Sequence, residues 1–456
     1  MLKISKFEQV ELLPYMGKWL VISSLIAILA GSASAGFLLS LESATQWREA
    51  HRWLIWLLPV AGLGVGLLYN WCGKSVDAGN NLIIDEVHDP KNVIPLRMAP
   101  LVLIGTLVSH LFGASVGREG TAVQMGGALA DQLTRLFRLK PEDRRILLMA
   151  GMSAGFSSVF GTPLSGAFFG LEVLAIGRMR YDALFPCLFA SVVANQVCLF
   201  WGVHHTAYAI GHIVPLGLWS TLAVVIAGVA FGITGMLFST LTQKLGRLVK
   251  SQIGWAPLRP LVGGALIAVL VWALDAWQFT GLGVPEIVRA FQQPVAPWEF
   301  AGKMFFTVLS LGTGFKGGEV TPLFYIGATL GNALAPLLHM PFAMMAGIGF
   351  VAVFAGAANT PVATTFMAIE LFGADIAPLA AIGCFTAYLF SGHTGIYHAQ
   401  RIGLSKTFFN KGDIPQNLRI SELPAFRKQL ATQKPVLADE KTVNRDVLIN
   451  TTDSAK

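Results

Sequence analysis

Apolar segments recur along almost the whole chain up to about residue 390, and they constrain its fold more than any other feature. Of the 456 residues, 54% are hydrophobic and only 13% are charged, with a mean hydropathy of +0.60. Soluble domains carry about 25% charged residues, so a soluble chain of this length would lack the ionic surface that it needs. The sequence therefore predicts an all-α, polytopic membrane protein and excludes disordered and disulfide-rich classes.

The apolar windows differ in length, and glycine- and proline-containing motifs separate them. Several are shorter than the roughly 20 helical residues that cross about 30 Å of hydrocarbon. Short interrupted windows predict tilted or broken helices, which a membrane tolerates only where the freed backbone is buried or lines a cavity. The windows cover residues 19–41, 53–71, 94–116, 121–137, 146–160, 163–176, 183–203, 216–245, 261–277, 305–314, 322–338, 342–356 and 361–390.

Short basic clusters before and between the windows predict the orientation of the chain. Such clusters favour the cytoplasmic side of a plasma (inner) membrane, most strongly in short loops. Because the basic residues serve as these anchors, the net charge of +7 does not indicate a nucleic-acid partner. The clusters are Lys3 and Lys6; Arg135, Arg138, Lys140, Arg144 and Arg145; Arg178 and Arg180; and Lys244, Arg247 and Lys250.

Two stretches of the chain repeat each other in order. Residues 162–172 (TPLSGAFFGLE) match residues 360–370 (TPVATTFMAIE), and residues 117–121 (GREGT) parallel residues 317–321 (GGEVT). Two ordered matches at nearly equal separation predict a structural repeat. Secondary transporters often arrange such repeats in inverted topology around a substrate site near the midplane, and we expect that arrangement here.

The repeat and a change in composition divide the chain into three parts. We expect a first transmembrane half at residues 1–203 and a second at residues 204–399. From about residue 400 the sequence becomes polar, and it shows no apolar periodicity after Phe426. Residues 400–456 are therefore predicted to form a cytoplasmic, largely disordered tail.

Glu119 is the most informative single residue. It lies between two apolar windows, where an ionisable group costs several kcal/mol and is rarely accidental. The flanking Gly117 and Gly120 allow close backbone approach, and the helix that begins near Thr121 directs its positive end towards the same place. The carboxylate can thus act as a built-in anion that leaves when it is protonated. The alternative is a helix-capping charge in a loop, and the residues alone favour neither interpretation.

Four ordered motifs resemble those of the CLC family of chloride channels and anion/proton exchangers. They are GREGTAVQ at residues 117–124, GTPLSG at 161–166 followed by Glu172, GEVTP at 318–322, and IYHA at 396–399. The resemblance extends from about residue 19 to residue 406. It implies a CLC-like fold, a pore tyrosine at Tyr397, and a homodimer with one pore in each subunit.

Three features resemble the fluoride/proton antiporter branch of that family. Residues 79–83 read GNNLI where chloride-handling members carry GSGIP, and Thr321-Pro322 also resembles the fluoride branch. Proton-coupled chloride exchangers carry a second glutamate after the position matched by Glu172, whereas this chain has Val173. The resemblance therefore implies exchange of one fluoride for one proton, with a different proton route.

The chemistry of fluoride agrees with an asparagine at this position. Fluoride holds its water tightly, so a selective site must replace that water with strong donors, and an amide offers two N–H donors where serine offers one O–H. For an isolated Asn pair after glycine, a turn or a helix cap is the better interpretation. The anion-binding residues expected from the whole set are Gly79, Asn80, Asn81, Gly120, Thr121, Val320, Thr321 and Tyr397.

The remaining polar groups carry weaker expectations. Glu172 and Glu370 occupy equivalent repeat positions and are expected to make ion pairs or helix-end contacts. Glu319 can serve a proton pathway or cap a helix, with Lys316 as a candidate partner. The four cysteines are expected to be free, buried thiols. Neither they nor the histidines show metal-ligand spacing, so no metal or cofactor is expected.

Three other functions compete with this interpretation. A chloride/proton exchanger and a passive anion channel share the fold, and Asn80 and Val173 argue against the first. An intramembrane enzyme would need a nucleophile or metal ligands beside Glu119 and Glu319, such as an HExxH motif, and the sequence contains none. We therefore expect the chain to be a transporter of fluoride and protons in the lipid bilayer, and not an enzyme.

Overall fold

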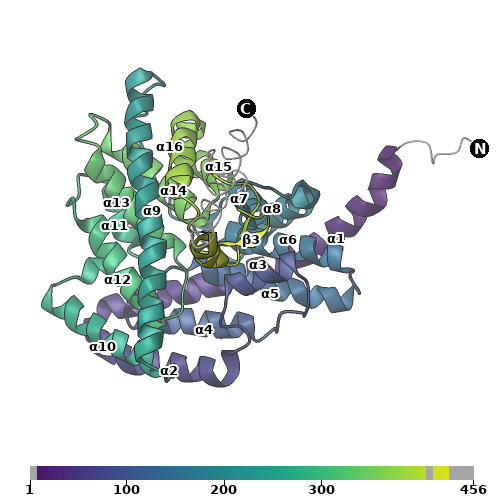
Figure 1. Cartoon of the computed structure of the whole chain (residues 1–456), viewed down its shortest axis with the longest axis horizontal. Helices are drawn as coiled ribbons and strands as arrows, with labels where there is room; N and C mark the ends of the chain where they lie inside the picture. Colours follow the sequence, from purple (N-terminus) through teal and green to yellow (C-terminus); the bar gives the residue numbers. More distant parts are fainter. Residues whose placement is uncertain (1–7, 407–413, 431–456) are drawn as a thin grey trace, which may run out of the picture.

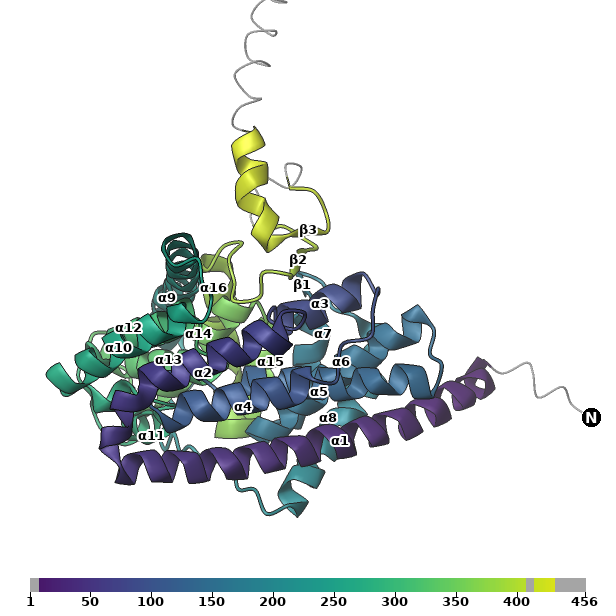
Figure 2. The ribbon, with the colours of Figure 1, turned by 90° about the horizontal axis from the view of Figure 1, so that it is seen from below.

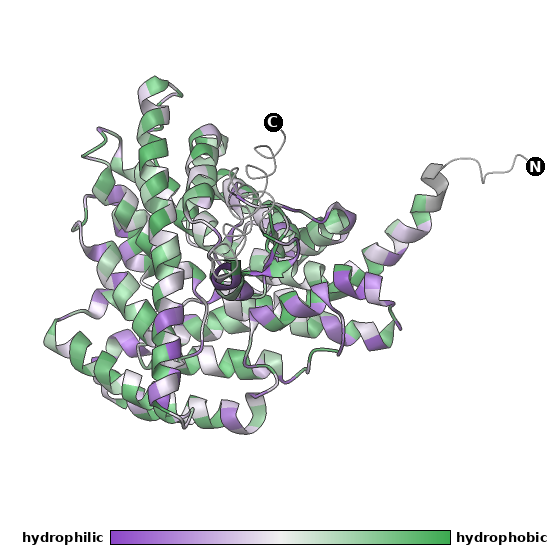
Figure 3. Cartoon of the chain, viewed as in Figure 1, coloured by the Kyte–Doolittle hydropathy of each residue, from purple (hydrophilic) through white to green (hydrophobic). Residues whose placement is uncertain are grey.

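The computed structural model describes residues 8–406 and 414–430, and these residues are almost entirely helical. Helices α1 (Glu8–Ala50) and α9 (Leu218–Gln252) are the longest, and each begins one half of the chain. In Figure 1 the first half, purple to blue, lies beside the second half, teal to green. Hydrophobic residues, coloured green, predominate along most helices in Figure 3. Among the described residues, four helical stretches are long and apolar enough to cross a membrane: Leu12–Ala50, Arg52–Gly73, Tyr181–Phe200 and Leu218–Gln252.

Most of the other helices are short, as the interrupted windows predict, and the expected all-α membrane fold is confirmed. The predicted window 361–390 is two helices, because the chain breaks at Gly373, which has φ of +97°. The first half contains η2 (Arg52–Leu57), α2 (Leu58–Leu68), η3 (Tyr69–Gly73), α3 (Asn80–His88), α4 (Met98–Leu111), α5 (Glu119–Leu136), α6 (Pro141–Phe160), α7 (Pro163–Glu172), η4 (Tyr181–Ala183) and α8 (Leu184–Phe200). The second contains α10 (Leu258–Ala273), η5 (Trp277–Phe279), α11 (Val284–Gln292), α12 (Glu299–Thr313), α13 (Val320–Leu334), α14 (Phe342–Ala358), α15 (Pro361–Phe372), η6 (Ala374–Ile376) and α16 (Ala377–Phe390).

The two halves pack their helices in the same way. Helix α5 packs on α6 and α6 on α8, just as α13 packs on α14 and α14 on α16. Helix α1 contacts α6 and α8, and α9 makes the equivalent contacts with α14 and α16. This matching set of neighbours supports the structural repeat. The exact boundary near residue 203 stays a prediction.

The repeated glutamates cap each other's helices. Glu172 ends α7 and accepts two backbone N–H groups at the N-terminus of α15, while Glu370 near the end of α15 accepts the two equivalent N–H groups of α7. The expectation of helix-end contacts is therefore confirmed, and the two helices must run antiparallel. The four bonds are Val362 N (3.1 Å) and Ala363 N (2.9 Å) to Glu172, and Leu164 N (2.8 Å) and Ser165 N (2.9 Å) to Glu370.

Equivalent aromatic rings also meet between the halves. Phe168 on α7 stacks on Phe366 on α15 with ring centroids 4.4 Å apart, and Phe156 on α6 faces Phe354 on α14 at 6.2 Å. Each ring thus contacts its own counterpart in the other half, as residues near a local twofold axis do. Together with the antiparallel run of α7 and α15, this agrees with the inverted arrangement expected of the repeat.

Arg144 does not act as an exposed orientation marker. Its side chain is buried and makes charge-assisted hydrogen bonds to Asp131 on α5 (2.8 Å) and Glu86 on α3 (2.9 Å). Asp131 also accepts the backbone N–H of Ile94 at 2.7 Å. The cytoplasmic side of this basic cluster stays a prediction, but the sequence did not indicate the buried pairs of Arg144. A basic residue in a short loop has the same local sequence whether it faces solvent or a buried carboxylate. Here it joins α3, α5 and α6.

Part of the predicted tail is folded. Strand β2 (Arg401–Ile402) pairs in parallel with β1 (Ala175–Ile176) and antiparallel with β3 (Leu418–Arg419). In Figure 2 this segment stands out from the helical body next to α3. Four apolar side chains in or just after these strands form a small cluster: Ile176, Ile402, Ile420 and Leu423.

The prediction of a largely disordered tail was therefore wrong for residues 400–406 and 414–430. Two-residue strands leave no detectable alternation, and their stability comes from partners far away in sequence. Arg401 pairs with Asp89 at 2.6 Å and Arg419 with Asp85 at 2.8 Å, both at the end of α3. Residues 407–413 and 431–456 lie outside the described residues.

The reciprocal caps predict a stability effect. Replacing Glu172 with alanine leaves two N–H groups without their acceptor, at a cost of about 1–3 kcal/mol for a buried unsatisfied group. We expect Glu172→Ala to lower the thermal unfolding midpoint of the detergent-purified protein, and Glu370→Ala to act in the same direction. Glu42→Ala is the control, because Glu42 is exposed on α1. A midpoint for Glu172→Ala equal to that of the control would contradict the capping role.

Candidate anion-binding site

Two glycine-rich turns face each other at the centre of the molecule. The backbone N–H of Gly117 donates to the carbonyl of Gly318 at 2.5 Å, and the N–H of Gly318 donates to the carbonyl of Gly117 at 2.7 Å. A Cβ on Gly318 would lie 2.8 Å from the backbone nitrogen of Gly120, so only glycine fits without a shift. The contact brings the N-termini of α5 and α13 together. Two helix N-termini that converge favour an anion between them.

Glu119 supplies that anion from within the chain. It is the first residue of α5 and is fully buried. Its carboxylate accepts the backbone N–H of Thr321 at 3.0 Å and the hydroxyl of Thr321 at 2.5 Å, both at the start of α13. It also accepts the backbone N–H of Arg118 at 3.2 Å. The carboxylate therefore occupies the place where the N-terminus of α13 would hold a diffusible anion.

A third helix N-terminus lies beside these two. Gly79 precedes α3 with φ of +59°, and a Cβ there would lie 3.1 Å from Nε2 of Gln124, so both conformation and space require glycine. Asn80 then begins α3, with its amide nitrogen close to Gly120 and its Oδ1 buried without a hydrogen-bond partner among the described residues. Amide oxygen and nitrogen exchange places by a flip. In either orientation, one polar atom of Asn80 is left to bind a ligand.

Asn80 opens onto a cavity of about 210 Å³, which we call the anion cavity. Gly79, Asn81, Glu319 and Tyr397 also line it. The Tyr397 side chain is buried, and its ring lies edge-on to Phe169 with centroids 6.2 Å apart. The cavity therefore brings together the Asn80 amide, the Tyr397 side chain and the Glu319 carboxylate.

Asn81 also links two parts of the cavity wall. Its Oδ1 accepts the backbone N–H of Ala399 at 2.9 Å, two residues after Tyr397. This bond fixes the start of α3 against the segment that carries the tyrosine. Asn81 therefore lines the cavity and also holds the segment after Tyr397 in place.

The structure places the other expected anion-binding residues outside the cavity lining. The Thr121 hydroxyl is buried and hydrogen-bonds to Thr106 on α4 at 2.7 Å. Val320 is buried at the start of α13, and Gly120 lies against Asn80. Thr321 contacts the Glu119 carboxylate, whereas Asn80, Asn81 and Tyr397 line the cavity.

Lys316 does not pair with Glu319. Its Nζ lies 2.5 Å from Oδ1 of Asp77 and 4.2 Å from the centroid of the Tyr69 ring. The expected partner was wrong because nearness in sequence is a poor guide at a turn, where Gly317 and Gly318 separate the two side chains. Asp77 is 239 residues away along the chain, and no local pattern could have indicated it.

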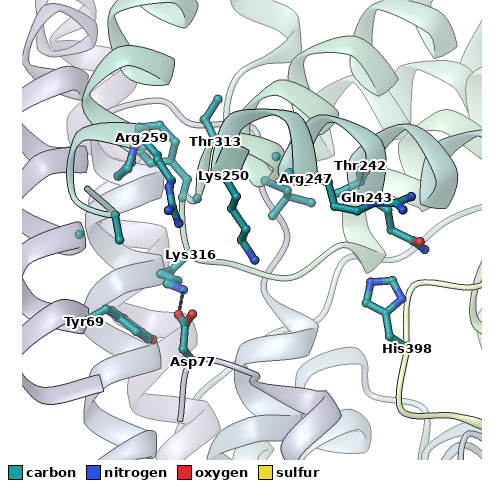
Figure 4. Close-up of a pocket in the computed structure, with 18 of the residues that line it drawn as sticks. Tyr69, Asp77, Thr242, Gln243, Arg247, Lys250, Arg259, Thr313, Lys316 and His398 are labelled. Carbon is teal, nitrogen blue, oxygen red and sulfur yellow. Dashed lines mark hydrogen bonds and ion pairs between the residues drawn. The ribbon is translucent and has the colours of Figure 1, made fainter. Parts of the chain in front are cut away.

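A larger cavity of about 720 Å³ adjoins the anion cavity. Figure 4 shows basic side chains around it, with the Asp77–Lys316 pair at one side. Two of these cations, Arg247 and Lys250, were predicted from the sequence only as orientation markers. We call this space the basic vestibule, after its basic lining residues Lys74, Arg247, Lys250, Arg259, Lys316 and His398.

The described part of the chain offers no obvious metal centre. Within residues 8–406 and 414–430, no group of three or more His, Cys, Asp or Glu side chains could hold a metal ion. The free cysteines are buried except Cys72, which is exposed, contrary to the expectation for that residue. The polar chemistry of the site thus comes from helix N-termini, amides, hydroxyls and two carboxylates.

Comparison with known proteins places this architecture. Residues 61–392 match the family model described as voltage gated chloride channel. A chloride/fluoride channel protein of Pseudomonas syringae pv. tomato is 67% identical over 450 residues, which cover 96% of this chain and 99% of that protein. A crystal structure of a CLC-type fluoride/proton antiporter is 35% identical, with a TM-score of 0.82 over 84% of this chain and 98% of that one. A slow cyanobacterial Cl⁻/H⁺ antiporter, 22% identical, shares the fold with a TM-score of 0.72 over 82% and 94%. The chain therefore belongs to the CLC family of anion channels and transporters.

Proposed function

We propose that this chain exports fluoride in exchange for protons, with Glu119 as the gate. The observation that carries the proposal is the pair of hydrogen bonds from the N–H and hydroxyl of Thr321 to the buried Glu119 carboxylate. As an anion, this group competes with fluoride for the N-terminus of α13. Protonation removes its charge and weakens both bonds, so that fluoride can take its place. A proton and a fluoride then use the same position in turn.

The choice of fluoride rests on Asn80. Asn80 lines a cavity at a helix N-terminus and has one buried polar atom without a hydrogen-bond partner among the described residues. An amide can present two N–H donors to a small, strongly hydrated anion. The relatives support this choice, since the 35% identical structure is described as a fluoride/proton antiporter and the 67% identical protein as a chloride/fluoride channel protein. Val173 occupies the place of the second glutamate of chloride exchangers. We propose that Glu319, which lines the anion cavity, takes part in the inner proton route.

Coupling to protons has an energetic advantage. When fluoride leaves and a proton enters, both charges move with a cell-negative potential, each contributing about 2.3 kcal/mol per 100 mV. The two together give about 4.6 kcal/mol, which supports a fluoride gradient on the order of a thousandfold before any pH gradient is added. A passive channel has half of this driving force.

We further propose a homodimer in the plasma (inner) membrane with one pore in each subunit. All the residues of the site come from one chain, so one subunit can form a complete pore. We also propose that the end of α9, the basic vestibule and residues 400–456 lie on the cytoplasmic side, because short basic clusters favour that side. Fluoride would then enter from the vestibule and leave past Glu119.

A passive channel is the second candidate, because the 67% identical relative is named a channel protein. A chloride/proton exchanger is disfavoured by Asn80 and Val173. Flux measurements separate all three functions.

The gate assignment predicts the effect of Glu119→Gln. A glutamine keeps the size of the side chain but cannot exchange a proton, so we expect proton movement to stop and fluoride movement to stop or become passive. Proteoliposomes loaded with fluoride, with simultaneous fluoride and pH electrodes, measure both. Glu42→Gln, an exposed glutamate on α1, is the control. Proton movement at the wild-type rate in Glu119→Gln would refute the assignment.

The selectivity assignment predicts the effect of Asn80→Ser. The hydroxyl offers one donor in place of two, and discrimination that rests on one lost hydrogen bond falls by roughly 1 kcal/mol, or about fivefold. We expect a lower ratio of fluoride to chloride efflux in proteoliposomes, with fluoride transport retained. Asn70→Ser, in the basic vestibule, is the matched control. An unchanged ratio in Asn80→Ser would remove this residue from the selective site.

A further inference from the structure

The ion pair between Asp77 and Lys316 lies where the basic vestibule meets the anion cavity. Both residues line both spaces, together with Tyr69, Leu311, Phe315 and His398. Asp77 comes from the turn that leads into α3, three residues before Asn80, and Lys316 comes from the turn that leads into α13, three residues before Glu319. The pair therefore connects the two turns that carry polar residues of the anion cavity.

The charges around the pair are strongly one-sided. Among the described residues that line the vestibule, Asp77 is the single carboxylate among several cations. Burial alone would raise the pKa of Asp77, but Lys316, Lys250 and Arg259 outweigh burial and hold its pKa below the ordinary value. Asp77 is thus ionised at neutral pH and neutralises the cation nearest the anion cavity.

The two partners are held with unequal firmness. The Lys316 side chain is 23% exposed and lies against the Tyr69 ring, with Nζ 4.2 Å from the ring centroid. The Asp77 side chain is 58% exposed. Pairs with one exposed partner contribute little to stability, so the carboxylate can leave the ammonium at small cost. Lys316 would stay in place, with its charge available to another anion.

We propose that Asp77 and Lys316 form an inner electrostatic gate, in which an anion from the vestibule must displace the Asp77 carboxylate from Lys316 before it enters the anion cavity. The inference rests on the proposed anion transport and adds a second built-in competitor, separate from Glu119. The two carboxylates act at opposite ends of the path. Glu119 competes at the N-terminus of α13, and Asp77 competes at the vestibule side of the cavity.

A purely structural clasp is the competing explanation, and the two make different predictions. If the pair only holds the two turns together, neutralising either member breaks it and has the same effect. If Asp77 masks Lys316, the two neutralisations act in opposite directions. Asp77→Asn leaves an unmasked ammonium that attracts anions, whereas Lys316→Gln removes the attraction.

The experiment measures fluoride efflux rate against internal fluoride concentration for the full-length protein in proteoliposomes. We expect Lys316→Gln to raise the half-saturating fluoride concentration and Asp77→Asn to lower it, each by up to about fivefold, the range of a partly exposed ion pair. Lys74→Gln is the matched control, because Lys74 lines the vestibule but not the anion cavity. Size-exclusion chromatography in detergent shows that each variant is folded.

A charge-exchanged variant, Asp77→Lys with Lys316→Asp, separates the two explanations further. A clasp would be restored by the exchange, whereas the proposed gate would not, because a carboxylate would then stand next to the anion cavity. Changes of the same sign in the single variants, unchanged half-saturation, or a return to wild-type kinetics in the exchanged variant would overturn the inference. If wild type carries no fluoride, the proposed function fails, and the same comparison made with chloride still tests the gate.

Discussion

The reciprocal backbone hydrogen bonds between Gly117 and Gly318 determine where everything else in the site lies. They hold two helix N-termini against each other inside a membrane protein, where unpaired N–H groups are expensive. Each end needs a negative partner, and Glu119 meets that need for α13 through Thr321. A place that must be occupied by an anion, and whose resident can lose its charge, is well suited to exchange of anions for protons.

Glutamates also cap helix N-termini away from the site. At the ends of α7 and α15 the chain again places a glutamate on the N-terminus of the equivalent helix, but there the carboxylates bind only backbone N–H groups of the opposite helix. Short helices require such partners because their ends lie within the fold and cannot all reach water. The chain thus contains two kinds of helix-capping glutamate, and Glu119 is the one that we propose a diffusible ion can replace.

The sequence predicts those parts of the site whose chemistry is local. Glu119 between glycines, Asn80 after Gly79, and the match of Glu172 with Glu370 are readable because composition and repeat constrain them directly. The contacts that the sequence did not predict join residues that are far apart along the chain: Asp77 with Lys316, and Arg144 with Glu86 and Asp131. The folded part of the tail was not predicted for the same reason. Its two-residue strands are stabilised by ion pairs of Arg401 and Arg419 with acids of α3 and the residue after it, and not by a local sequence pattern.

Those pairs have a mechanical consequence. Helix α3 is only nine residues long: its first residue, Asn80, faces the anion cavity, and acids at its other end bind Arg401 and Arg419. The strand that holds Arg401 begins four residues after Tyr397. A change in the C-terminal segment would therefore reach two sides of the anion cavity at once, through α3 to Asn80 and along the chain to Tyr397.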